Sequence, residues 1–159
     1  MGAFVVGSRQ ADAARRQTIE AEERALRHRS RAYFAVAEVA HDLMANLRPT
    51  LAELENALIS LIFAFSDAEF DAAINAMNAV PLHDLGNAEA IRSFVAIKDL
   101  SRYFSMTIDN LMSPETPDDP RGADPLGVQT KDEMRLSAMR LITNVQTQFE
   151  ILRTSLKLD

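Results

Sequence analysis

The hydrophobic residues of this chain recur every three or four positions, the spacing that places them on one face of an α-helix. The clearest pattern covers positions 31–65 and consists of two stripes, Tyr33, Val36, Ala40, Leu43 and Leu47, then Leu51, Leu54, Leu58, Leu61 and Phe65. Pro49 lies between the stripes, and proline kinks or ends a helix because it has no amide hydrogen to donate. The pattern predicts two amphipathic helices that meet at Pro49.

Three Ser/Thr-x-x-Glu sequences mark helix starts, because such a pair can form a capping box. They are Thr50 with Glu53, Ser66 with Glu69, and Thr130 with Glu133. We therefore expect helices over 50–65, from 66 to Pro81, and from 131 nearly to the end, with a further helix over 88–112 capped by Asn87. The end of the helix over 50–65 is apolar nearly all round, so we expect it deep in the core.

Glycine is scarce, and no strand-like alternation of polar and apolar residues is present. Several apolar stripes that each need cover predict an all-α fold, an antiparallel bundle of four or five helices with a long projecting N-terminal helix. We expect residues 1–30 to form a basic helical segment, here called the arm, with juxtamembrane or coiled-coil character. Residues 31–159 would form the bundle, with an acidic proline-rich loop at 113–127.

The arm has a thin apolar seam. Ile19 and Leu26 lie seven residues apart and in phase with Tyr33, as in a heptad repeat, whereas Glu22 and Arg29 occupy the alternate positions. These two residues have no evident partner within the chain. The pattern therefore favours contact of Ile19, Leu26 and Tyr33 with a second copy of the chain or with another helical protein.

Charge is unevenly distributed along the chain. Residues 1–31 contain seven arginines and four acidic residues, a net charge of +3, which leaves −9 on the rest of a chain whose total is −6. Arg24, Arg27 and Arg31 share a helix face and could contact a partner or an anionic membrane surface. Nucleic acid is disfavoured as a partner, because the acidic body would repel a polyanion and no nucleic-acid-binding motif is present.

The short apolar run Ala3–Gly7, followed by arginines, is also what the end of a membrane anchor lying upstream of residue 1 would leave. The run is itself too short to span a bilayer. Cytoplasmic, periplasmic and membrane-tethered locations all remain open at this stage.

Little in the sequence indicates catalysis. There is no cysteine, no phosphate-binding glycine loop and no Gly-x-Ser-x-Gly elbow. Glu38 and His41 form half of a carboxylate–histidine pattern for iron or manganese, but no second Glu-x-x-His exists, and pairing of the two on the helix surface explains them as well. We assign no catalytic, cofactor-binding or metal-binding residue.

The sequence thus predicts a non-enzymatic interaction or assembly module, self-associating through its N-terminal helix. Two alternatives stay open. One is a bundle that binds or senses a small molecule in a pocket lined by methionine and phenylalanine residues, and the other is the soluble part of a membrane-tethered accessory protein.

Overall fold

The computed structural model of the chain describes residues 3–53, 57–114, 116, 118 and 129–158. These residues form five α-helices and one short 3-10 helix, without a strand: α1 (Ala3–Ala52), α2 (Ala57–Ala64), α3 (Asp67–Asn78), η1 (Leu82–Leu85), α4 (Ala88–Met112) and α5 (Lys131–Ser155). The predicted all-α fold with a long N-terminal helix is confirmed.

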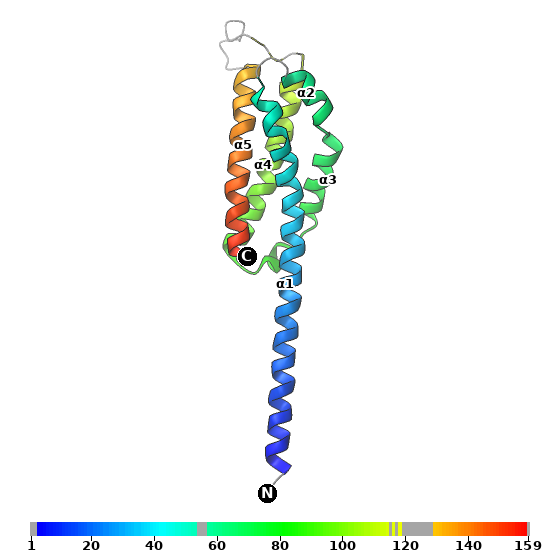
Figure 1. Cartoon of the computed structure of the whole chain (residues 1–159), viewed down its shortest axis with the longest axis vertical. Helices are drawn as coiled ribbons and strands as arrows, with labels where there is room; N and C mark the ends of the chain where they lie inside the picture. Colours follow the sequence, from blue (N-terminus) through cyan, green and yellow to red (C-terminus); the bar gives the residue numbers. More distant parts are fainter. Residues whose placement is uncertain (1–2, 54–56, 115, 117, 119–128, 159) are drawn as a thin grey trace.

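The second half of α1 runs along the bundle and contacts every other helix, while its first half extends alone beyond the end of the bundle (Figure 1). Helices α4 and α5 form the most extensive pair, and α3 packs against α1 and α4. The 3-10 helix η1 lies at the end where the arm leaves, whereas α2 lies at the opposite end (Figure 1).

The core lies among α1, α3, α4 and α5. Its largest fully buried side chains are those of Phe70, Phe94, Phe104 and Met44. Ala37 and Ala40 are also completely buried on α1, and their small side chains let neighbouring helices approach closely. Phe149 of α5 contacts two aromatic rings of α1, those of Phe34 and His41, each with a centroid distance of 4.5 Å.

Three of the predicted helix starts are confirmed. Thr130 and Glu133 form a complete capping box, in which the Glu133 amide donates to Thr130 Oγ1 at 3.3 Å and the Thr130 amide donates to Glu133 Oε2 at 2.9 Å. The Asn87 side chain accepts from the Ala90 amide at 2.8 Å, and Ser66 caps α3 through the Glu69 amide.

The predicted start of a new helix at Thr50, just after Pro49, is wrong. Helix α1 continues through Pro49 to Ala52, so Thr50 lies inside the helix and does not cap a new one. The Glu53 amide instead donates to the backbone carbonyl of Thr50, at 3.3 Å. Pro49 is exposed, whereas Leu51, two residues later, is fully buried. Burial of Leu51 offsets the hydrogen bond that proline cannot make near the helix end.

The prediction for the second apolar helix is also wrong. Helix α2 has eight residues, and of its apolar side chains Leu61 is fully buried while Phe63 is 86% exposed. Ile59 and Ile62 are exposed as well. A short helix at the end of a bundle can bury only the side that faces its neighbours, so its all-round apolar character does not place it in the core.

Most of the acidic proline-rich loop at 113–127 lies outside the described residues. Lys131, at the start of α5, forms an ion pair with Asp118 at 2.9 Å. Among the described helices, none combines the length and the apolar character that crossing a bilayer requires.

Candidate functional site

The arm is the part of the molecule that the bundle leaves uncovered. Every side chain from Gln10 to Arg29 is exposed to solvent. Ile19 and Leu26, the two apolar residues predicted to contact a partner, have exposed fractions of 55% and 48%. The described part of the chain therefore provides no cover for either of them.

The bundle covers the continuation of the same heptad stripe. Tyr33 is half-buried, Ala40 is fully buried and Leu47 is nearly so. Ile19 and Leu26 thus belong to a stripe that forms the core contact of α1 farther along. The same helix face that packs inside the bundle is left without a neighbour on the arm.

Tyr33 was expected to contact a partner, but in the structure it contacts the bundle. Its hydroxyl donates a hydrogen bond of 2.9 Å to Asp84 Oδ2 on η1. The hydrogen bond raises the pKa of Tyr33, because ionisation of the phenol would remove the donated proton beside a carboxylate. Tyr33 and Asp84 are 51 residues apart in the sequence, so patterns of local residue spacing do not predict their contact.

Two further side chains lie near Asp84 at the base of the arm. Arg29 Nη1 lies 3.9 Å from Asp84 Oδ1, and His83 Nε2 lies 3.4 Å from the same oxygen. Gly86 follows η1 with a φ of 80°, a left-handed conformation that glycine adopts without strain. This turn ends η1 and leads into α4.

The arginines proposed as contact residues, Arg24, Arg27 and Arg31, are all exposed. Arg24 Nε donates to the backbone carbonyl oxygen of Glu20, at 3.2 Å, rather than to the Glu20 carboxylate. A guanidinium that uses one N–H group in this way keeps further donors directed to solvent. These three residues therefore remain accessible to an anionic partner.

A groove between α1 and α3 was not predicted. Its volume is about 580 Å³, and small or aliphatic residues form nearly all of its lining: Ala35, Val36, Val39, Leu43, Glu69, Ala72, Ala73 and Ala76. Val39 is 52% exposed within it. Val36 and Leu43 belong to the predicted apolar stripe of α1, but the alanines that form the opposite wall on α3 do not distinguish a groove from an ordinary helix surface.

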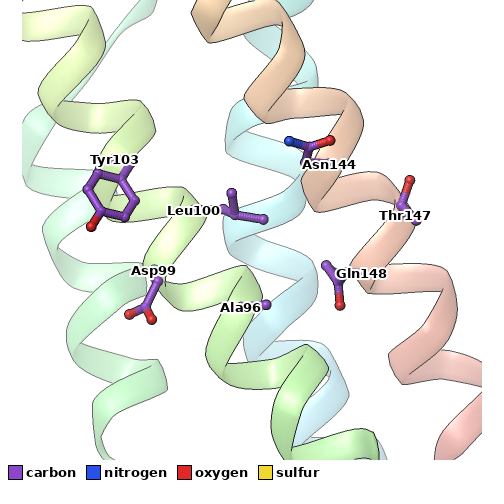
Figure 2. Close-up of a pocket in the computed structure, with 7 residues that line it drawn as sticks. All are labelled: Ala96, Asp99, Leu100, Tyr103, Asn144, Thr147 and Gln148. Carbon is purple, nitrogen blue, oxygen red and sulfur yellow. The ribbon is translucent and has the colours of Figure 1, made fainter.

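A second depression lies between α4 and α5 and has a volume of about 320 Å³. Figure 2 shows Asp99, Leu100 and Tyr103 from α4 on one side, and Asn144, Thr147 and Gln148 from α5 on the other. Its lining contains no methionine or phenylalanine, unlike the pocket that the sequence suggested. The volume is at the low end for small-molecule sites, and most of the lining residues carry polar side chains.

His41 takes part in packing rather than in a pair with Glu38. Its Nδ1 lies 2.9 Å from Asp42 Oδ1, and its ring stacks on Phe149. Within the described residues, no group of three or more His, Asp or Glu side chains is arranged to hold a metal ion.

Two apolar surfaces on α1 suit a protein partner, the seam of Ile19 and Leu26 on the arm and the groove that α1 forms with α3. The exposed side chains of Ile59, Ile62 and Phe63 on α2 form a further apolar surface at the other end of the bundle. The seam lies on α1 alone, whereas the groove is formed by α1 and α3 and includes the core residue Ala73. Comparison of the chain with protein-family models, with curated proteins and with solved structures found no match.

Proposed function

We propose that this chain is a non-enzymatic assembly module that associates with further copies of itself through the arm. The observation that carries the proposal is the exposure of Ile19 and Leu26 on a helix that extends beyond its own bundle. Most helical stability in proteins comes from packing of an apolar face, and an isolated helix in water is marginal. A second helix against the arm would supply that packing.

The seam contains few apolar residues, so we expect association through it to be weak. Only Ile19 and Leu26 are large apolar residues among positions 10–29, and Glu22 and Arg29 lie at the alternate heptad positions. Two such side chains bury far less apolar area than a long leucine zipper. We therefore expect a dimer or small oligomer that dissociates on dilution.

The test is the solution mass of the intact chain. Substituting Ile19→Glu and Leu26→Glu together places two carboxylates on the seam, and the mass measured by light scattering should fall. The control is Ala13→Glu, which adds a carboxylate on the far side of the arm and should leave the oligomer intact. A wild-type chain that is monomeric at high concentration would refute the proposal, as would an unchanged mass in the seam variant.

A further inference from the structure

We infer that the groove between α1 and α3 is the docking site for the arm of a second copy of this chain, with the two α1 helices antiparallel. The inference rests on the proposed self-association and adds to it a surface, an orientation and a register. It uses a helix face different from the seam of Ile19 and Leu26, so the seam and the groove are two separate contacts between copies.

The groove has the shape and chemistry that a helix requires. Its walls are Ala35 and Val39 on α1 and Ala72 and Ala76 on α3, residues separated by about one helical turn on each side. Such small side chains let a third backbone approach closely, as in helix-in-groove recognition. Val39 is half-exposed and gains cover when the groove is filled.

The arm presents a matching face. Ala14, Thr18, Ala21, Ala25, His28 and Ala32 follow one another at intervals of three and four, and all are exposed. The same series continues into the groove at Ala35 and Val39. It contains no Lys, Arg, Asp or Glu, although these residues are common elsewhere on the arm. One face of α1 therefore carries both halves of the proposed contact.

Charge selects the arm of a second copy as the occupant. Residues 10–31 contain six arginines and four acidic residues, a net charge of +2. Helix α3, which forms one wall of the groove, contains Asp67, Glu69 and Asp71 and no Lys or Arg. Parallel pairing would set one basic arm against the other, whereas antiparallel pairing sets each arm against the acidic α3 of its partner.

Length selects the register. The arm part of α1, residues 3–29, is about 40 Å long, and the bundle part, residues 30–52, is about 35 Å long. When residue 30 lies at the centre of an antiparallel pair, each arm covers the bundle part of the other helix. Ala25 then faces Ala35 of the second copy, and Ala21 faces Val39. The contact is identical on both copies, so the dimer is closed.

The absence of cysteine allows a direct test of this register. Two single variants are prepared, Ala25→Cys and Ala35→Cys, and are oxidised separately and after mixing. The mixture should give a disulfide-linked dimer, because positions 25 and 35 face each other. Each variant alone should not, since equal positions would lie about 15 Å apart along the pair, well beyond the ~7 Å between Cα atoms that a disulfide spans. Cross-linking of Ala25→Cys with itself would indicate parallel pairing and overturn the inference.

A second experiment keeps this inference separate from the proposed function. Val39→Glu places a carboxylate in the groove and should lower the solution mass while the seam contact remains, with helicity unchanged in circular dichroism. Tyr103→Glu, an exposed position on α4 away from the groove, is the matched control and should keep the oligomer. An oligomer that is lost in the Ile19 and Leu26 variant but kept in Val39→Glu, without cross-linking between 25 and 35, would overturn the inference and leave the proposed function standing.

Discussion

Tyr33 and Asp84 join the long helix to the bundle where the arm leaves it, through a hydrogen bond of 2.9 Å from the phenol to the carboxylate. Asp84 belongs to η1, which follows α3, so the contact holds α1 to a segment far along the chain. Arg29 approaches the same carboxylate from one helical turn earlier. Together they fix the base of the arm against the end of the bundle.

The first prediction concerns ionisation of Tyr33. The hydrogen bond to Asp84 raises its pKa above 10.0, so the phenol should titrate at higher pH in the folded protein than in the unfolded chain. The stability that this bond provides is fully present below pH 10 and is lost as the pH rises through the folded pKa. Absorbance titration of the Tyr103→Phe variant, which leaves Tyr33 as its single tyrosine, measures this value.

Asp84→Ala provides the control for that titration. Removal of the acceptor should bring the pKa of Tyr33 down towards its ordinary value of 10.0. An identical titration curve with and without Asp84 would show that the hydrogen bond is not formed in solution.

The second prediction concerns Asp109 on α4. Burial raises the pKa of this carboxyl, and the negative charges of Asp67 and Asp71 on α3 raise it further. Because the folded state disfavours the ionised form, the charge costs stability above the folded pKa, and the cost disappears below about pH 3.8, where the group is protonated in both states. Asp109→Asn should therefore raise the melting temperature at pH 7.

The increase in melting temperature that Asp109→Asn produces should become smaller as the pH is lowered. Asp99→Asn removes the same charge from the same helix, ten residues before Asp109, and serves as the control. Equal melting temperatures for wild type and Asp109→Asn at pH 7 would contradict the proposed crowding of carboxylates.

The third prediction separates the two sides of α2. Leu61 is fully buried, so Leu61→Ala should lower the free energy of unfolding by about 2–5 kcal/mol through lost burial and a residual cavity. Phe63 is 86% exposed, so Phe63→Ala should change it by less than about 0.5 kcal/mol. Denaturant unfolding of both variants measures the difference, and a large loss in Phe63→Ala would show that α2 packs the other way round.

The fourth prediction concerns the helix caps. Thr130→Ala removes the capping box of α5 and should cost about 1 kcal/mol of stability. Thr50→Ala is the informative comparison, because Thr50 belongs to an identical sequence motif but lies inside α1. Denaturant unfolding should show a clearly smaller loss in the free energy of unfolding for Thr50→Ala than for Thr130→Ala. Equal losses would indicate that a helix starts at Thr50.

The predicted and the observed helices together show how far the sequence specifies the fold. Apolar spacing and local caps act over three or four residues, and they correctly located α3, α4 and α5 with their starts at Ser66, Asn87 and Thr130. They failed at Pro49, because continuation of α1 depends on burial of Leu51 by distant helices rather than on local preference. The prediction that α2 lies deep in the core was wrong for a related reason, because the composition of a segment does not show how many other helices pack against it.

The candidate surfaces follow the same division. Exposure of Ile19 and Leu26 was expected, because a sparse stripe on a long helix offers too little apolar area to be covered. The Tyr33–Asp84 contact and the groove between α1 and α3 depend on residues brought together only by the fold. Alanine and valine residues at the edge of the α1 stripe do not by themselves predict a groove, because its second wall is formed by α3.

Helix α1 is a single rod that serves as a wall of the core at one end and projects freely at the other. With about 40 Å of helix beyond the bundle, a tilt of about 10° at its base swings the tip by about 7 Å. Any force applied to the tip acts as a torque on Tyr33 and on the buried residues that follow it. Movement of the projecting end of α1 is therefore coupled directly to the packing of the hydrophobic core.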